Sequence, residues 1–397
     1  MGALSHLRVL DLSRVLAGPW ASQVLADLGA DVIKIERPEG GDDTRAWGPP
    51  WVEDALWGEA PQSAYFVCAN RNKRSVVLDL ASSDGQDVIR KLVARCDVLI
   101  ENFKVGGLKA YGLDYESLKL LNPGLVYCSI TGFGQSGPYA SRPGYDFIVQ
   151  GMGGLMSITG RADGEAGAGP LKVGVALTDV LTGLYAVVGI QAALAHRERT
   201  GIGQHIDVAL LDVQVAALAN QAMNYLASGK QPPRLGNAHP NIVPYQDFQT
   251  SDGYIIVTVG NDGQFRRLAG MVGLPELADD PRYATNNARV VHRAELIALL
   301  SAAFLANTCA HWLEALEGNG VPCGPINDME QVFSDPHVLH RGMRVGLPGS
   351  DNPANAFVGS PLKLSQTPVE YRRPPPALGA DTDEVLAELE QMPMASP

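Results

Sequence analysis

Residues 7–36 read LRVLDLSRVLAGPWASQVLADLGADVIKIE, and this stretch decides the fold class. Its two β-rich runs, residues 7–12 and 31–36, flank a segment predicted to be helical from Gly18 to Leu28. The pattern recurs in SVVLDL (75–80), a helical segment at 84–94 and DVLIE (97–101). Strands that alternate with helices are typical of parallel βαβ units, so two successive units predict a doubly wound α/β sheet.

The loops after these strands are the expected ligand-binding region, because ligands of doubly wound sheets bind beyond the carboxyl ends of the strands. Those ends carry SRVLAG (13–18), RP (37–38) and ENFK (101–104). The glycine-containing segments AGP (17–19) and GFG (132–134) would let backbone N–H groups approach a phosphate. Ordinary tight turns explain the same glycines equally well, so both interpretations stay open.

The rest of the chain continues the α/β pattern and then changes. A third strand is expected at 124–130, with helices at 146–156 and 179–196. The segment GKQPPR (229–234) indicates a linker. Beyond it we expect a small α+β domain, with a hairpin at 248–259 turned at Asp252-Gly253. Further helices are predicted at 263–272, 291–306 and 310–318, and a final helix from Asp381.

Composition restricts the class of protein. The chain has 397 residues, of which 46% are hydrophobic and 19% charged, as in a globular protein with two domains. Its formal net charge of −12 argues against a nucleic-acid partner, which would need a basic surface. An anionic ligand must therefore be held by local basic residues.

The cysteines and the apolar segments indicate the expected compartment. Five cysteines, without the spacing of metal ligands, predict reduced thiols and no metal site. The amino terminus lacks the apolar core of a signal peptide, so we expect a cytoplasmic protein. The apolar stretch from Val180 to Ala195 is shorter than a membrane span, and we predict a buried core helix and no membrane partner.

Asp179 is the acidic residue with the most informative position in the sequence. It precedes a long uncharged stretch, where a carboxylate would accept N–H groups at a helix start and stay ionised, as a nucleophile must. A plain N-cap explains the position at least as well. His239 is equally ambiguous, because a loop histidine is either a ligand contact or a solvated turn residue. No GxGxxG, GxxxxGK[ST], GxSxG or HExxH motif is present.

Basic residues gather near the predicted strand ends and loops: Arg37, Lys73, Arg74, Lys104 and Arg142. Individually each is most simply a solvated surface charge. Together they would form a site for a polyanionic cofactor in an otherwise acidic protein.

Colinear motifs along the whole chain resemble the class III (CaiB/BaiF) CoA-transferases. They are LDLSRVLAGP (10–19), LGADVIKIERP (28–38), NKRS (72–75), VLIENF (98–103), SITGFG (129–134), GVALTD (174–179) and RTGIGQHID (199–207). Within the family, GDDTRAWGPP (41–50), VPYQDF (243–248) and GNDGQF (260–265) are most similar to members that act on succinyl-CoA and glutarate.

The resemblance implies an architecture. It predicts a Rossmann-like large domain of residues 1–200 and 330–397, a linker helix at 201–228 and a small α+β domain at 229–329. It further implies an interlocked, ring-through-ring homodimer.

The resemblance also assigns roles to residues. Asp179 falls on the catalytic aspartate of the family, which would carry anhydride and aspartyl-CoA thioester intermediates. Coenzyme A is implied as substrate and carrier, with no tightly bound cofactor. Its expected contacts are Leu16, Ala17, Arg37, Leu78, Asp79, Asn102, Phe103, Lys104, Arg142 and Tyr145.

The expected reaction is CoA transfer from an acyl-CoA, succinyl-CoA above all, to a carboxylic acid such as the dicarboxylate glutarate. A second carboxylate needs a partner, for which Arg45 and His239 are candidates. The alternatives are an α-methylacyl-CoA racemase and a non-catalytic acyl-CoA-binding protein. Racemases carry Gly-His-Asp where this chain has Gly144-Tyr145-Asp146, and an ordinary tyrosine is a poor base at neutral pH.

Overall fold

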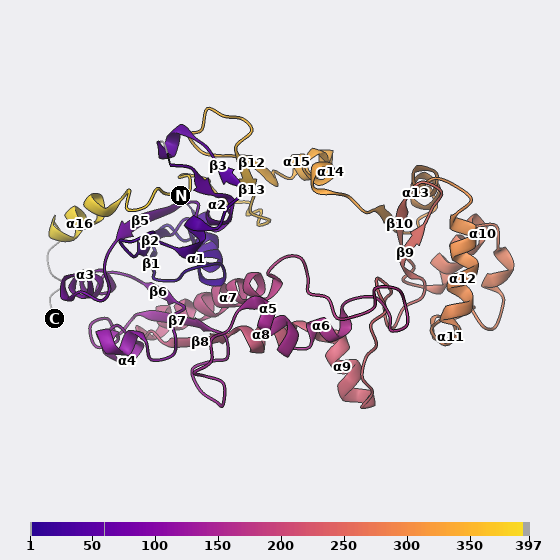
Figure 1. Cartoon of the computed structure of the whole chain (residues 1–397), viewed down its shortest axis with the longest axis horizontal. Coiled ribbons are helices and arrows are strands. Elements are labelled where there is room, and N and C mark those ends of the chain that lie inside the picture. Colours follow the sequence, from indigo (N-terminus) through magenta and orange to yellow (C-terminus); the bar gives the residue numbers. More distant parts are fainter. Residues whose placement is uncertain (1, 59, 392–397) are drawn as a thin grey trace. The chain divides into compact units, whose positions relative to one another are not determined.

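The computed structural model describes residues 2–58 and 60–391. These divide into two compact units, whose elements are labelled in Figure 1. The first unit takes the chain up to residue 155, residues 173–227 and the chain from residue 336 onward. The second takes residues 156–172 and 228–335.

A parallel sheet forms the centre of the first unit. Among the described residues it has six strands in the order β5-β2-β1-β6-β7-β8. Their bounds are β1 Arg8–Asp11, β2 Asp31–Glu36, β5 Lys73–Val77, β6 Val98–Glu101, β7 Val126–Thr131 and β8 His205–Ala209. In chain order this is 3-2-1-4-5-6, the order of doubly wound dinucleotide-binding folds. The prediction of a parallel α/β sheet is confirmed.

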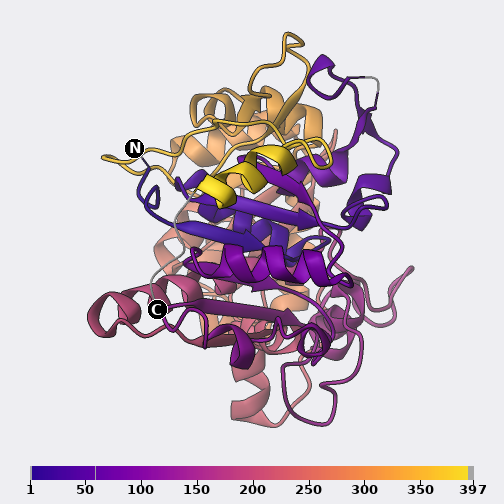
Figure 2. The same ribbon diagram turned by 90° about the vertical axis from the view of Figure 1, so that its left-hand side faces the viewer.

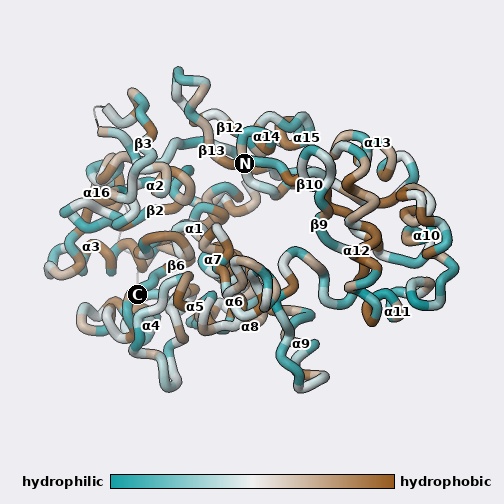
Figure 3. The backbone as a smooth tube through the Cα atoms, turned by 45° about the vertical axis from the view of Figure 1, so that its right-hand side comes forward, coloured by the Kyte–Doolittle hydropathy of each residue, from teal (hydrophilic) through white to brown (hydrophobic). Residues whose placement is uncertain are grey.

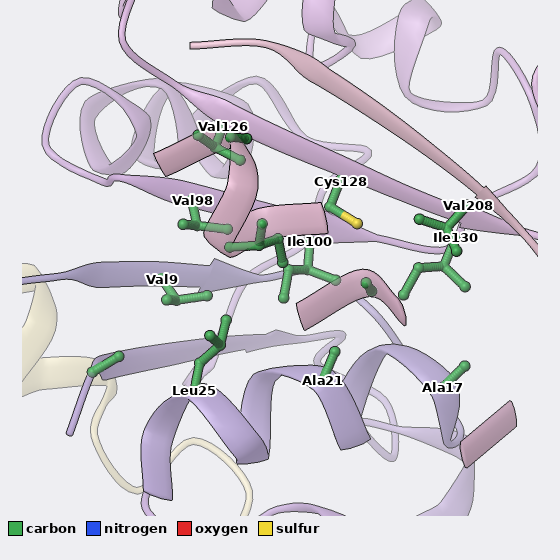
Figure 4. Packing of buried hydrophobic residues seen from close by; sticks show 14 of the residues in the cluster. Val9, Ala17, Ala21, Leu25, Val98, Ile100, Val126, Cys128, Ile130 and Val208 are labelled. Atoms are coloured by element: carbon green, nitrogen blue, oxygen red, sulfur yellow. The ribbon is translucent and has the colours of Figure 1, made fainter. Parts of the chain in front are cut away.

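The strands are hydrophobic on both faces because helices cover both. Figure 4 shows strand residues such as Val9 and Ile100 pointing toward Ala21 and Leu25 of α1. The helices of this unit are α1 Ala17–Asp27, α2 Ala64–Ala69, α3 Ser83–Val93, α4 Tyr115–Leu118, α5 Asp146–Met152, α7 Leu177–Thr200, α8 Leu210–Ala217, α15 Pro336–His340 and α16 Thr382–Gln391. A separate cluster on the other face includes Leu10, Ile33 and Leu99.

Smaller elements complete the first unit. Two antiparallel pairs join β3 Trp51–Val52 to β4 Gln62–Ser63 and β12 Arg344–Gly346 to β13 Ala356–Val358. Short 3-10 helices span Asp43–Ala46, Ala55–Trp57 and Leu108–Tyr111. The final helix α16, yellow in Figure 2, packs on β5, the edge strand of the sheet.

Residues 201–228 differ from the expected linker helix. The segment contains strand β8, helix α8 and helix α9 Ala219–Ser228. β8 pairs in parallel with β7, with Ile206 opposite Cys128 and Val208 opposite Ile130. Its sequence HIDVA alternates polar and apolar residues, as expected for a strand at the edge of a sheet, and lacks the continuous apolar run by which the other strands were identified.

Helix α7 is longer and less buried than predicted. Its Thr182, Gly183, Ala186 and Ile190 are buried, and Gly183 lies so close to Trp20 of α1 that an added Cβ would stand 3.2 Å from its side chain. The opposite face exposes Leu184, Tyr185 and Val188. By length and composition alone, α7 would suffice to cross a membrane, and helices Arg293–Phe304 and Cys309–Gly318 would do so as a bent pair.

The second unit has its own core. Strands β9 Tyr245–Gln249, β10 Tyr254–Thr258 and β11 Cys323–Pro325 form an antiparallel sheet in the order β11-β10-β9. Phe248 of this sheet is buried against Phe304, with Leu300 in the same core, and Figure 3 shows the hydrophobic residues along helix α12, Arg293–Phe304. The helices are α10 Asp262–Met271, α11 Asn286–Val291, α12 Arg293–Phe304, α13 Cys309–Gly318 and α14 Met329–Ser334, with a 3-10 turn at Pro275–Ala278. Helix α6, Leu155–Ile158, spans the junction of the two units.

Candidate active site

A pocket of about 320 Å³ lies where β1, β6 and β7 end. Asp179 lines it, together with the predicted CoA contacts Leu16, Ala17, Asn102, Phe103, Lys104, Arg142 and Tyr145. The pocket lies at the point where the strand order reverses, because β1 pairs with β2 on one side and with β6 on the other. Open α/β sheets bind their ligands at this switch point.

A second pocket, of about 250 Å³, shares Arg14 and Phe103 with the first. The remaining predicted CoA contacts, Arg37, Leu78 and Asp79, line it. The residues that the sequence assigned to CoA therefore line two pockets with common walls, although they come from five separate loops. Their contact with CoA stays a prediction.

Arg14 is a site residue that the sequence analysis missed. Its Nη1 lies 2.8 Å from Asp43, its guanidinium lies 5.8 Å from the centre of the Phe103 ring, and its Nε has no partner among the described residues. Its backbone N–H donates to the Asn102 side chain. The available signal was its place directly after the first strand, where the expected ligand region begins.

The loop between β1 and α1 holds an unusual backbone conformation. Val15 has φ of 72°, a region that β-branched residues rarely adopt. Its N–H donates to Asp42 at 3.2 Å, while the Lys34 ammonium donates to the Ser13 carbonyl at 2.8 Å. Such strain persists only where the surroundings fix the backbone, and it is common in ligand-binding loops. Here it places Leu16 and Ala17 on the pocket wall.

The glycines of the strand-end loops serve close packing. A Cβ on Gly18 would lie 2.2 Å from the Ser13 hydroxyl, and one on Gly132 would lie 2.5 Å from the Gly144 Cα. Gly132 and Gly144 both line the first pocket. Larger residues would push apart the loops that form it.

Buried ion pairs and hydrogen bonds hold these loops in place. Lys34 and Asp42 pair at 2.9 Å and both side chains are fully buried. Lys73 is equally buried and donates to Asp11, Asn70 and the Pro19 carbonyl. Burial lowers the pKa of Lys73 to about 8. Lys73 was expected near the ligand site, but it is a structural cation beneath α1.

Arg74 lines neither of these two pockets. It pairs with Asp31 at 2.7 Å and with Glu388 at 2.6 Å, at the amino ends of the strands. Lys104 and Arg142, by contrast, line the first pocket. The basic cluster expected from the sequence therefore separates into residues that line a pocket and residues that form structural ion pairs.

Asp179 lies in the first turn of α7, whose N-cap position is Ala176. The alternative interpretation of Asp179 as a plain N-cap is wrong, because Asp146 of α5 accepts the N–H of Thr178 at 2.8 Å and that of Asp179 at 3.3 Å. Burial, and next the charge of Asp146, raise the pKa of Asp179 to about 7. The helix dipole acts in the opposite direction and favours the anion.

Tyr65 of α2 is a further neighbour that the sequence analysis did not identify. Burial, and next the charge of Asp179, raise the pKa of Tyr65 to about 12. Its ring packs edge-on against Trp47, with the ring centres 5.2 Å apart.

The two candidates for a distal carboxylate lie in different surroundings. Arg45 donates to Glu36 through Nε at 2.8 Å and Nη2 at 2.7 Å, and to Gln62 through Nη1. Its side chain is 9% exposed, so the guanidinium fork is already filled within the chain. His239 belongs to the second unit, where its ring lies 5.2 Å from that of Tyr245 and Nδ1 accepts the N–H of Asn241. Burial lowers the pKa of His239.

The sequence profile described as CoA-transferase family III matches residues 4–382. The chain belongs to CoA-transferase family III. This confirms the resemblance drawn from its motifs and makes the protein an enzyme of the CoA-transferase type.

Individual relatives agree with this family. The CoA-transferase is 59% identical over 387 residues to the succinate--glutarate CoA-transferase of Agrobacterium fabrum, covering 98% of this chain and 96% of that protein. It is 45% identical over 386 residues to the succinyl-CoA:glutarate CoA-transferase of Homo sapiens, covering 97% of this chain and 86% of that protein. A solved CAIB/BAIF family protein from Brucella suis superposes with a TM-score of 0.86 at 52% identity, covering 98% of this chain and 99% of that one.

Proposed function

We propose that this CoA-transferase moves CoA from succinyl-CoA to glutarate, with Asp179 as the nucleophile. The observation that carries the proposal is that Asp179 shares a pocket with seven residues expected to hold CoA. The relatives named as glutarate CoA-transferases, which cover nearly the whole chain, support the choice of substrates.

The reaction begins when the Asp179 carboxylate attacks the thioester carbonyl of succinyl-CoA. The C–S bond breaks, CoA leaves as the thiolate, and a mixed succinyl-aspartyl anhydride remains. The thiolate then attacks the aspartyl carbonyl, which releases succinate and leaves an aspartyl-CoA thioester. A glutarate carboxylate attacks this thioester, the C–S bond breaks, and the thiolate leaves a glutaryl-aspartyl anhydride. The thiolate then attacks the glutaryl carbonyl, which gives glutaryl-CoA and frees the Asp179 carboxylate.

Oxyanions develop at each of these steps and need hydrogen-bond donors. The start of α1 has no side-chain cap, and Leu16 and Ala17 at this start line the pocket of Asp179. We assign oxyanion stabilisation to backbone N–H groups of this turn, whose position the strained Val15 sets. Water must be excluded, because it would hydrolyse the thioester.

The pockets suggest how CoA is held. Arg14, Lys104 and Arg142 bring three cations to the walls of the first pocket in an acidic protein. Cations of this kind are suited to phosphate groups. Arg37, Leu78 and Asp79 would take the far end of CoA in the second pocket.

We also propose the expected homodimer, interlocked as ring through ring, in which the first unit is the CoA-binding domain and the second unit is the small domain. An exposed apolar surface on α5, α7, α8 and α9 supports a second copy. Its large residues are Phe147, Ile148, Leu184, Tyr185, Val188, Val215, Met223, Tyr225 and Leu226. Apolar surface of this kind on a folded chain marks an interaction site.

The test is incubation of the purified protein with succinyl-CoA and glutarate, followed by mass detection of acyl-CoA species. We expect glutaryl-CoA, and none when glutarate is omitted. Deuterium uptake at the α-carbon of a 2-methylacyl-CoA without exchange of acids would instead support the racemase. Binding of acyl-CoA without either product would support the non-catalytic alternative.

A further inference from the structure

The first turn of α7 is held by a side chain from another helix. Asp146, the first residue of α5, uses one carboxylate oxygen, Oδ1, to accept the N–H groups of Thr178 and Asp179. Its second oxygen, Oδ2, accepts an N–H of the Gln150 side chain at 2.7 Å. The residue before the nucleophile and the nucleophile itself are thus both anchored to α5.

Gln150 extends this anchor along the chain that leads into α7. Its side chain is fully buried, and Oε1 accepts the N–H of Val173 at 3.0 Å. Thr178 is fixed from the other side, because its hydroxyl donates to Gln214 of α8 at 2.6 Å. The backbone of Asp179 is therefore held between α5 and α8.

The charge of Asp146 has a second effect. A serine, threonine or asparagine would accept the same N–H groups without charge repulsion. A carboxylate beside a partly buried carboxylate instead disfavours ionisation of its neighbour. Burial and Asp146 are together the causes that raise the pKa of Asp179 to about 7.

The other charged and titratable groups around Asp179 are few. The first turn of α1 carries no acid, the acid in the first turn of α8, Asp212, is exposed, and α2 contributes Tyr65. The loops of the first pocket contribute Tyr145 and three cations, Arg14, Lys104 and Arg142. Asp146 is the acid among them that bonds directly to the backbone of the nucleophile.

We propose that Asp146 is a positioning residue for CoA transfer: it fixes the turn that presents Asp179 to the pocket, and its charge makes the Asp179 carboxylate a stronger nucleophile. This inference rests on the proposed role of Asp179. A nucleophile works best when its pKa is matched to the working pH, and like-charge pairs are one way to adjust it.

The test compares Asp146→Asn and Asp146→Ala with the parent enzyme by kcat/KM for succinyl-CoA between pH 5 and pH 9. Asn keeps an oxygen for the two N–H groups but removes the charge. For Asp146→Asn we expect the acidic limb of the pH profile of kcat/KM to move to lower pH by about one unit. Its kcat at high pH should stay within about threefold of the parent. Ala removes the anchor as well, so kcat should fall at least about tenfold at every pH.

Two controls separate this from a structural effect. Gln150→Ala removes the same Gln150 hydrogen bond as Asp146→Asn but keeps the charge, so its acidic limb should match the parent. Asp212→Asn removes an exposed negative charge from α8 and should leave both the acidic limb of the pH profile and kcat unchanged. This control remains valid if Gln150→Ala does not fold.

The inference is overturned if the acidic limb of Asp146→Asn coincides with the parent, if Asp212→Asn moves it equally, or if Asp146→Ala keeps full kcat. Asp179→Asn, measured in parallel, tests the proposed function separately. An active Asp179→Asn enzyme removes Asp179 as nucleophile, whatever Asp146 does. An inactive one leaves the result at Asp146 to decide the positioning role.

Discussion

The Asn102 side chain joins the two strands of the switch point by bonding both backbone groups of Arg14. Its Oδ1 accepts the Arg14 N–H at 3.0 Å and its Nδ2 donates to the Arg14 carbonyl at 2.7 Å. The ends of β1 and β6 are thereby fixed to each other where the two pockets meet. Because Arg14 lines both pockets, the Asn102 amide holds in place a residue that the two pockets share.

We therefore expect Asn102→Ala to raise the KM for succinyl-CoA by about tenfold, because a loosened loop binds CoA less well, with a smaller loss in kcat. Steady-state kinetics against both substrates measure this. Asn319→Ala, an exposed amide at the end of α13 in the second unit, is the matched control and should leave KM unchanged. An unaltered KM in Asn102→Ala would contradict the role given to the switch point.

The raised pKa of Asp179 predicts a pH-dependent gain in stability for Asp179→Asn. In the folded state the carboxyl titrates near pH 7, against its ordinary value of 3.8. The favourable contribution of protonated Asp179 to the free energy of unfolding is therefore present at low pH and is lost as the pH rises through 7. Removing the charge should raise the free energy of unfolding more at pH 8 than at pH 5, by about 1–3 kcal/mol. Urea unfolding at the two pH values measures it, and an equal effect at both would contradict the raised pKa.

Asp42→Ala should destabilise the protein strongly. It leaves the buried Lys34 ammonium without its carboxylate and frees the Val15 N–H, which together cost about 3–5 kcal/mol. Lys34 lowers the pKa of Asp42 to about 2, so the contribution of the pair is present above the ordinary value near 4 and lost as the pH falls toward 2. The neighbouring Asp43 pairs with two partly exposed arginines, and Asp43→Ala should cost at most about 1 kcal/mol in the same unfolding experiment.

Arg45→Lys separates a structural role from the substrate role expected from the sequence. Since Glu36 and Gln62 fill its guanidinium, we expect the lysine variant to lower Tm and to change KM for glutarate and butyrate alike. A KM that rises for glutarate while that for butyrate stays constant would restore Arg45 as the dicarboxylate contact. His239→Ala, assayed with the same two acids, tests the other candidate.

Much of the sheet could be predicted because its strands are covered by helices on both faces and read as apolar runs. DVIKIE at 31–36 became β2 with the expected bounds. β8 was missed because His205 and Asp207 interrupt its apolar residues. The exposed side of α7 could not be foreseen, because an apolar helix reads the same whether the chain itself or another molecule covers it.

The candidate site was predictable where it follows strand ends and unpredictable where distant side chains pair. Asn102 and Phe103 could be located because they directly follow a strand. Asp146 caps a turn 32 residues away, and no local pattern marks such a partner. The ion pair of Arg45 with Glu36 at the end of β2 was not foreseen either, and the substrate role of Arg45 stays a prediction.

Asp179 is proposed to carry the acyl and CoA groups during turnover. Hydroxylamine added during turnover with succinyl-CoA, followed by peptide mapping by mass spectrometry, traps such an intermediate. We expect a hydroxamate on Asp179, absent when succinyl-CoA is omitted and absent in Asp179→Asn. Modification of another carboxylate, or full turnover with Asp179 unmodified, would contradict it.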